Sequence, residues 1–94
     1  MRQEFTQAVR IPTDVLFQEL DGEMILLSLE TEEYYELNES GTKILLLLAG
    51  AASIQTAYDA LLKEYVVQPD TLREDLLTLV DELVSHGLVE VSTP

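Results

Sequence analysis

The chain has 94 residues, 47% of them apolar, with 18 acidic and 5 basic side chains and a formal net charge of −13. This length gives one domain with a modest core, and the apolar content excludes a disordered tail. The acidic balance excludes binding to phosphate backbones or anionic membranes and favours partners with basic patches.

The first 14 residues are predicted to form an N-terminal arm, and residues 15–94 the folded domain. Apolar side chains are sparse in the arm, and Pro12 interrupts any helix there. We expect part of the arm to add an irregular extended segment.

Two strands joined by a hairpin are predicted next. Residues 15–20 and 24–29 are β-compatible, and Asp21-Gly22 stands between them. This dipeptide is a strong hairpin signal because a type I′ turn needs a positive φ at both central residues.

A third strand is predicted over residues 33–37, after the glycine-free turn "ETEE". Tyr35 and Leu37 share one face of this strand and are expected to face the core, while Tyr34 and Glu36 share the other face. Three strands joined by short turns form an antiparallel meander, and the third strand lies at its edge.

Three helices are predicted after the strands. Asn38 is a good N-cap for a helix that runs to about Ala49, with Gly50 as the residue beyond its end. Ser53 caps a second helix, in which apolar residues recur at helical spacing as far as Tyr65.

The third helix is predicted to begin near Pro69 and to end at Gly87. Its apolar arc is broad, about 160° at the helical angle per residue. The arc consists of Leu72, Leu76, Leu77, Leu79, Val80, Leu83 and Val84. The segment "LVEV" after the helix suits a short final strand. The predicted fold class is therefore α+β and winged-helix-like, with a three-stranded antiparallel sheet followed by three helices.

Patterns for catalysis or cofactor binding are absent from the sequence. It contains no phosphate-binding glycine loop, no zinc-protease or serine-hydrolase motif and no calcium loop. The one histidine, His86, falls in the last turn of a predicted helix, where we expect a structural or solvent role. The acidic pairs Glu32-Glu33 and Asp81-Glu82 are interpreted as solvated charge. We therefore predict a protein that is not an enzyme and holds no metal or cofactor.

Three further features bear on where the chain works. Cysteine is absent, the N-terminus has no apolar segment of the signal-peptide type, and the longest apolar run covers only residues 44–49. A membrane span needs about 20 residues. These features fit a cytoplasmic protein.

Several binding functions are compatible with a small acidic domain. An acyl carrier needs a serine in an Asp-Ser-Leu-like context at a helix start, and neither Ser40 nor Ser53 fits. A DNA-binding winged helix needs a basic recognition helix, but the third helix carries one arginine and five acids. The edge strand instead suits an extended peptide added as a fourth strand, or it is a structural edge blunted by Glu33 and Glu36.

The ordered set of elements resembles the PqqD-like family. It is most similar to the stand-alone lasso-peptide B1 proteins, which recognise the precursors of ribosomally made, modified peptides. The resemblance covers residues 15–91. It is carried by the strand-to-helix junction Tyr35-x-Leu37-Asn38, by Gly50, by Asp75 with the stripe Leu76, Leu79 and Leu83, and by Gly87-Leu88. The chain departs from the family at Glu32-Glu33, where many relatives have a glycine, so the type of this turn is open.

The resemblance implies that a leader peptide is bound as a fourth strand on the third strand. The side chains of the leader would then enter a cleft between this strand and the third helix. The implied peptide-binding residues are Glu33, Tyr34, Tyr35, Glu36 and Leu37 on the strand and Leu72, Arg73, Leu76, Leu77, Leu79 and Val80 on the helix. Which flank of the helix lines the cleft is left open by the sequence.

The resemblance further implies an adaptor in lasso-peptide biosynthesis, which delivers the leader to a B2-type leader peptidase and to a macrolactam-forming cyclase. Two other functions stay open at this point. One is a PqqD-type chaperone for a radical enzyme in cofactor maturation, and the other is a small acidic regulator that binds a basic protein. A homodimer through the bare edge strand, in the absence of a leader, is also open.

Overall fold

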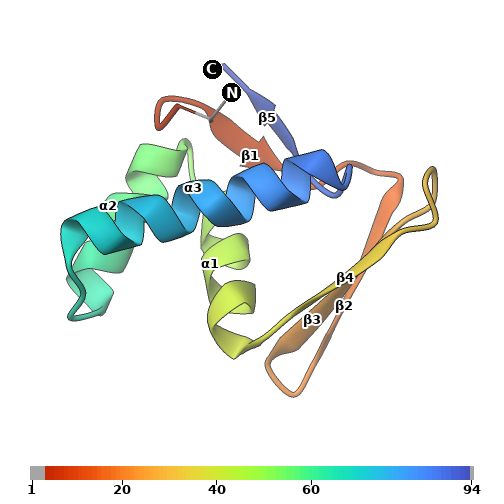
Figure 1. The fold of residues 1–94 in the computed structure, drawn as a ribbon, viewed down its shortest axis with the longest axis horizontal. Coiled ribbons are helices and arrows are strands. Elements are labelled where there is room, and N and C mark those ends of the chain that lie inside the picture. The colour runs from red at the N-terminus through yellow and green to blue at the C-terminus, as the bar shows by residue number, and fades with distance from the viewer. Residues whose placement is uncertain (1–3, 94) are drawn as a thin grey trace.

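The computed structural model describes residues 4–93, which form two sheets and a group of three helices (Figure 1). In chain order the elements are β1 (Ala8–Arg10), β2 (Val15–Leu20), β3 (Glu23–Ser28), β4 (Tyr34–Leu37), α1 (Glu39–Gly50), α2 (Ile54–Glu64), α3 (Pro69–Ser85) and β5 (Glu90–Ser92). The predicted α+β class, with a three-stranded antiparallel sheet followed by three helices, is confirmed. Its likeness to a winged helix stays a prediction.

The main sheet is the predicted meander, with antiparallel pairing in the order β2-β3-β4. Asp21 (φ 54°) and Gly22 (φ 84°) both take a positive φ, as the predicted tight turn requires. β3 lies one residue earlier than predicted, because the chain turns at Leu29, which is exposed. β4 begins at Tyr34, so Glu33 belongs to the preceding turn.

The turn between β3 and β4 contains a left-handed residue although it has no glycine. Glu32 takes a φ of 63°. Its N–H donates to the carbonyl of Ser28 at 2.8 Å, and the N–H of Ser28 donates to the carbonyl of Glu33 at 2.9 Å. Left-handed backbone costs an L-residue about 1–2 kcal/mol, so these two bonds hold a strained turn in place.

The junction between β4 and α1 is fixed by side chains. The side chain of Asn38 accepts a hydrogen bond from the N–H of Gly41 at 2.8 Å, which confirms the predicted N-cap. The buried hydroxyl of Thr42 donates to the carbonyl of Leu37 at 3.3 Å. The last residue of β4 is therefore tied to the first turns of the helix that packs under the sheet.

Two predicted features of the first two helices are wrong. Gly50 is the last residue of α1 and not a left-handed residue beyond it, because Ala51 (φ −93°) closes the helix in an extended conformation. Tyr65, which the apolar pattern includes in the second helix, instead follows α2 as its C-cap and is 37% exposed. The apolar pattern therefore runs past the end of the helix. The predicted cap of α2 is confirmed, since the Ser53 hydroxyl accepts from the N–H of Thr56.

The predicted end of α3 is confirmed. Gly87 is left-handed (φ 69°), and its N–H donates to the carbonyl of Val84 at 3.0 Å. The N–H of Leu88 donates to the carbonyl of Leu83 at 2.9 Å. This pair of bonds is the Schellman arrangement, for which glycine is the favoured residue.

The N-terminal segment and the C-terminus form a second sheet. β1 pairs antiparallel with β5, with Val9 opposite Val91, so the predicted final strand is present. Phe5 and Val9 are buried in the main core. The carbonyls of Phe5 and Gln7 accept from the first N–H groups of α2. Within residues 4–14, the segment assigned as an arm thus packs on the domain.

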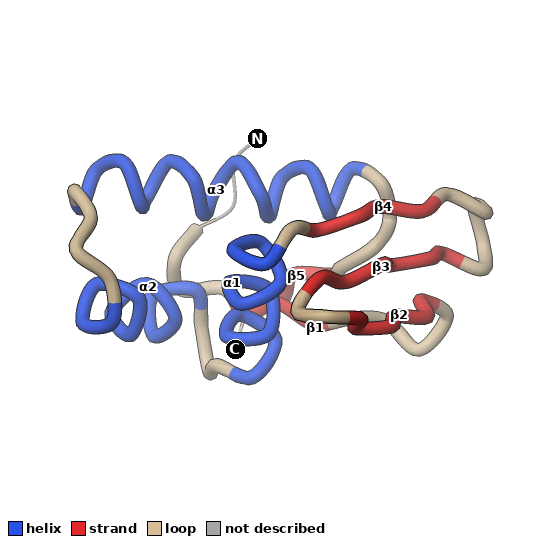
Figure 2. The backbone as a smooth tube through the Cα atoms, turned by 90° about the horizontal axis from the view of Figure 1, so that it is seen from below, coloured by secondary structure: helices blue, strands red, loops and turns tan. Residues whose placement is uncertain are grey.

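The core lies between the main sheet and the three helices. Figure 2 shows α1 next to the strands, α2 on its far side, and α3 passing along both toward the β4 side of the sheet. The fully buried large side chains are Met24, Leu26, Leu45, Leu48, Ile54, Leu61, Leu76, Leu83, Leu88 and Val80, together with Thr42 and Ser28. None of the helices within residues 4–93 is long and apolar enough to cross a bilayer.

Leu37 is expected to be a main contributor to stability. The prediction that it faces the core is confirmed, since it is 5% exposed and belongs to the core cluster. Leu37→Ala should lower the free energy of unfolding by about 2–4 kcal/mol, the range for truncating a buried leucine. Urea denaturation followed by circular dichroism measures the change, with the exposed Leu46→Ala as the control. An unfolding midpoint equal to that of the wild type would contradict the assigned core face.

Candidate peptide-binding site

The main sheet has two edges, β2 and β4, and only four residues form the β4 edge. Within residues 4–93 no further strand of this sheet lies beside β4. An edge strand offers unpaired N–H and C=O groups that can pair with another extended chain. The predicted position of β4 at an edge is therefore confirmed, and the next question is which of its backbone groups face outward.

The hydrogen-bond register answers this question. In an antiparallel pair, residues alternate between those bonded to the neighbouring strand and those that point away from it. The N–H of Ser28 donates to the carbonyl of Glu33, and Tyr35 lies opposite Leu26 two residues further on. Tyr35 and Leu37 therefore direct their backbone groups toward β3. The N–H and C=O groups of Tyr34 and Glu36 point to the open edge.

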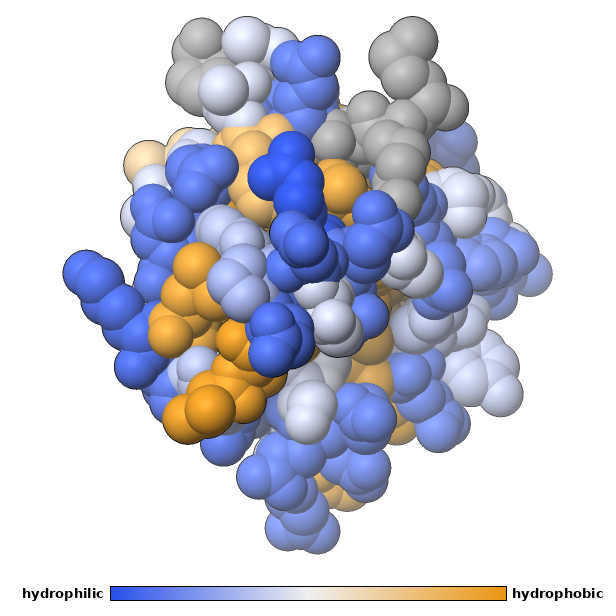
Figure 3. Space-filling view, turned by 60° about the vertical axis from the view of Figure 1, so that its left-hand side comes forward, coloured by the Kyte–Doolittle hydropathy of each residue, from blue (hydrophilic) through white to orange (hydrophobic). Residues whose placement is uncertain are grey.

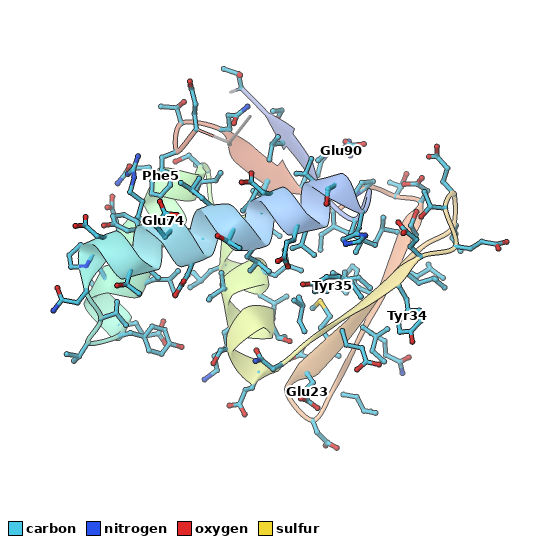
Figure 4. The ribbon with its side chains drawn as sticks, viewed as in Figure 1. Phe5, Glu23, Tyr34, Tyr35, Glu74 and Glu90 are labelled. Atoms are coloured by element: carbon cyan, nitrogen blue, oxygen red, sulfur yellow. The ribbon has the colours of Figure 1, made fainter. Side chains whose placement is uncertain are left out.

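Side chains connect β4 to the last two turns of α3. The hydroxyl of Tyr35 donates to a carboxylate oxygen of Glu82 at 2.5 Å. The Nδ1 atom of His86 lies 3.6 Å from the Glu33 carboxylate, and its ring lies 5.7 Å from the Tyr35 ring. We call these four residues the β4–α3 junction. Figure 4 shows Tyr35 on the helix side of the strand, and Tyr34 on the opposite side.

The surroundings of Tyr35 in the junction shift the pKa of its phenol. Its hydrogen bond to Glu82 raises the pKa of the phenol above the ordinary value of 10.0, and burial and the negative charge of Glu82 act in the same direction. The neutral phenol is therefore the form that the folded chain favours. Its stabilisation is present below the ordinary pKa and is lost as the pH rises through the raised value.

This linkage gives a testable pH dependence. The wild type should lose more stability than Tyr35→Phe as the pH rises above about pH 9, because the unfolded chain releases the proton of this phenol at a lower pH than the folded chain does. Both proteins keep the other three tyrosines, so the difference isolates Tyr35. Urea denaturation at each pH measures it. Parallel stability profiles for the two proteins would show that the bond to Glu82 does not form in solution.

The junction identifies which flank of α3 faces the edge strand. Leu79, Glu82 and His86 follow the i, i+3, i+7 spacing, and a helix turns about 100° per residue, so they share one flank. Arg73 lies on another flank, with its guanidinium carbon 4.1 Å from the centre of the Phe5 ring. The flank with Glu82 therefore faces β4, and the flank with Arg73 faces the N-terminal segment.

The structure separates the residues that the sequence grouped as one site. The predicted strand residues, Glu33, Tyr34, Tyr35, Glu36 and Leu37, lie together at the sheet edge or in the turn before it. Of the predicted helix residues, Leu72, Leu76, Leu77 and Val80 are at most 7% exposed and belong to the core. Leu79 is partly buried and shares the flank of the junction. Arg73 and Leu77 lie on other sides of the helix.

Sequence reasoning did not place Glu82 and His86 at the site. The sequence pattern favours solvated charge for Glu82 and a structural or solvent role for His86. The available signal was their spacing from Leu79, which puts them on the flank beside the apolar arc. Periodicity alone does not tell which flank of a helix meets an edge strand, so this spacing could not assign Glu82 and His86 to the site without the fold.

The described residues contain no group of three or more His, Asp or Glu side chains that could hold a metal ion. The outward backbone groups of β4 and the partly buried Leu79 lie beside the junction, which itself offers two carboxylates, a phenol and an imidazole. These groups suit recognition of an extended peptide, whose main chain pairs with β4 and whose side chains alternate between the two faces of the sheet.

Comparisons with known proteins match this part of the chain. The family model described as "Coenzyme PQQ synthesis protein D (PqqD)" matches residues 23–89, which run from β3 past the end of α3. No curated protein matches the chain.

Two solved structures have the same fold. One is described as "TbiB1 in Complex with the TbiA(beta) Leader Peptide". Its protein chain is 31% identical in sequence to this chain, and the match covers 86% of this chain and 94% of the other, with a TM-score of 0.79. The other is described as "Lasso peptide synthetase B1 complexed with the leader peptide". Its protein chain is 26% identical in sequence to this chain, and the match covers 87% of this chain and 96% of the other, with a TM-score of 0.77.

Proposed function

The chain belongs to the PqqD family, as its sequence resemblance predicted, and from this premise we propose that it binds the leader region of a ribosomally made precursor peptide. It then presents the leader to the leader protease and the macrolactam-forming cyclase of lasso-peptide biosynthesis. The observation that supports this most strongly is the similarity, across nearly the whole chain, to TbiB1 and to a lasso peptide synthetase B1, both solved in complex with a leader peptide.

The leader binds by adding a strand to β4. The outward N–H and C=O groups of Tyr34 and Glu36 supply up to four hydrogen bonds, two from each residue, as in other cases of strand addition. These bonds do not depend on leader side chains, so they give affinity and register. The hydrogen bond between Thr42 and Leu37 holds β4 in position, so β4 loses little conformational entropy when the leader pairs with it.

Specificity comes from the leader side chains that point toward the helices. On that side they meet the flank of α3 that carries Leu79, Glu82 and His86. Leu79 offers apolar contact, which contributes roughly 1.5–3 kcal/mol when a large apolar side chain is fully buried. In the free chain, the Tyr35–Glu82 hydrogen bond joins β4 to this flank of α3. A leader side chain therefore either packs beside Tyr35 or displaces its hydroxyl from the carboxylate.

The chain acts in this scheme as an adaptor and not as a catalyst. The junction groups bind the leader, and the chemistry takes place on the enzymes that receive it. No cofactor or metal takes part in our proposal. A PqqD-type chaperone that serves a radical enzyme would use the same strand addition, so the identity of the precursor separates the two functions.

A leader titration tests the proposal. The probe is a fluorescent synthetic leader of a candidate lasso precursor, followed by fluorescence polarisation. We expect saturable one-to-one binding, and none by a scrambled leader of the same composition. Binding of both peptides alike would favour a non-specific acidic regulator. Binding only of a precursor that a radical enzyme modifies would favour the chaperone.

A further inference from the structure

The sheet face that points away from the helices is apolar and exposed. Its apolar members are Leu16, Leu20, Ile25, Leu27 and Tyr34, and we call this surface the outer face. Leu16, Leu20, Ile25 and Tyr34 are between 46% and 67% exposed. Leu16 lies opposite Leu27, and Leu27 opposite Tyr34, so one apolar row crosses all three strands. A contiguous exposed patch of this kind marks an interaction site.

The outer face is also hollowed. Ile25 stands between two shallow hollows. One measures about 420 Å³ and is lined by Leu16, Phe17, Gln18, Ile25 and Leu27. The other measures about 410 Å³ and is lined by Leu20, Glu23, Met24, Ile25, Glu36, Leu37 and Asn38. The first hollow, where four of the five lining residues are apolar, is able to take an apolar side chain of a partner, which is the form that binding hot spots take.

The charges around the outer face have one sign. Residues 11–38, which include the whole main sheet, contain no lysine, arginine or histidine. They contain eight acids: Asp14, Glu19, Asp21, Glu23, Glu30, Glu32, Glu33 and Glu36. Glu36 lies opposite Ile25, and Glu23 opposite Leu20, so two of these carboxylates belong to the outer face itself. The apolar row is therefore bordered by negative charge.

These charges decide what covers the outer face. A second copy placed face to face would bring two such acidic borders together, and like charges across an interface are unfavourable. Anionic membranes are repelled for the same reason. The occupant that fits is a protein whose contact surface is apolar at its centre and rich in lysine and arginine at its rim.

We propose that the outer face is the docking surface for an enzyme that processes the leader-bound precursor and that has this apolar, basic-rimmed contact surface. The inference rests on the proposed leader binding. A leader strand on β4 turns every second side chain to the outer face, next to Tyr34 and Glu36. The docking surface is thus continuous with the bound leader, and a partner there meets adaptor and substrate together.

Another apolar region provides a control. Leu46 on α1 and residues 65–67 after α2 are also exposed, and Lys43 lies beside Leu46 in a separate hollow. Figure 3 shows the molecule from the α2 side, where hydrophilic residues cover most of the surface and the largest of the exposed apolar areas lies at the lower left. This region lies on the helices and does not adjoin β4, so substitutions in it should leave docking unchanged.

The experiment compares Leu16→Thr/Ile25→Thr with Leu46→Gln. Threonine suits a strand and removes the apolar contact, and neither residue of the first pair belongs to β4. The probes are the purified leader peptidase and cyclase encoded with the precursor, each titrated by calorimetry with and without the leader peptide. Leader affinity and oligomeric state of every variant are measured first, by polarisation and by light scattering.

We expect at least one enzyme to bind the wild type and to lose about tenfold or more in affinity for Leu16→Thr/Ile25→Thr, while leader affinity changes less than about twofold. Leu46→Gln should match the wild type. Glu23→Lys should weaken docking less at high salt than at low salt, because its effect is electrostatic.

Three results would overturn the proposal: equal docking of Leu16→Thr/Ile25→Thr and wild type, docking of neither enzyme, or a wild-type dimer that the outer-face substitutions dissociate. Failure of the leader to bind the wild type would instead count against the proposed function, and the polarisation measurement shows this separately.

Discussion

Replacing Glu36 by proline is expected to weaken leader binding by about tenfold or more while the fold stays intact. Proline removes the outward N–H, so a carbonyl of the leader loses its donor, at a cost of roughly 1–3 kcal/mol for an unsatisfied group. The β3 side of the strand is unaffected, because the register directs the backbone of Glu36 to the open edge. Prolines are tolerated at such positions of edge strands. Fluorescence polarisation with the leader measures the loss.

Two matched variants separate the N–H from other effects. Glu36→Ala removes the same carboxylate but keeps the donor, so it should bind the leader almost as well as the wild type. Tyr35→Pro removes an N–H that faces β3, and it should lower the stability of the chain itself. If Glu36→Pro and Glu36→Ala bind the leader equally well, the main chain of β4 is not where the leader adds.

The second large effect is expected at Leu79. It is partly buried on the flank of α3 that faces β4, so Leu79→Asp should leave the chain folded and reduce leader affinity about tenfold or more. The fully buried Leu76 is unsuitable for this test, because a charge there would unfold the core. Circular dichroism checks the fold of the variant, and Leu46→Asp serves as the control for an added charge elsewhere.

The salt dependence of the same titration separates burial from attraction by the net charge of −13. Exposed ion pairs contribute about 0–1 kcal/mol each and are screened at physiological salt. Wild-type affinity should therefore fall only modestly between low and high salt, and Leu79→Asp should bind poorly at both. A fall of about a hundredfold with salt, together with normal binding by Leu79→Asp, would make the acidic surface the binding site.

Much of the fold follows from local chemistry that is visible in the sequence. Asp21-Gly22 takes the positive φ values of the predicted hairpin, Asn38 caps α1, and Gly87 ends α3. These residues act through their own backbone or through a neighbour a few positions away. For Gly50 the same rule failed, because the helix ended one residue later in an extended cap for which no glycine is needed.

Contacts between distant segments were harder to predict. The pairing of β1 with β5 joins residues that lie about 80 positions apart, and nothing in three-residue strands such as Ala8–Arg10 specifies a partner. The flank of α3 that meets β4 was equally hidden, because the apolar arc has two borders. The bond between Tyr35 and Glu82 distinguishes them only once the chain is folded.

The outer face went unrecognised for a different reason. β2 contains apolar residues on both of its sides, so its pattern does not tell a buried face from an exposed one. The helices cover Val15 but not Leu16, and Phe17 remains 55% exposed although its side of the strand faces the helices. The extent of the helical layer, and not the apolar pattern, decides which residues of β2 are buried.

Amide hydrogen exchange of the chain with and without saturating leader tests strand addition most directly. We predict that the amides of Tyr34 and Glu36 exchange rapidly in the free chain and become protected in the complex. Those of Tyr35 and Leu37 should be protected in both states, since they already pair with β3. Protection that arose instead along β2, at Phe17 and Glu19, with Tyr34 and Glu36 unchanged, would contradict the account.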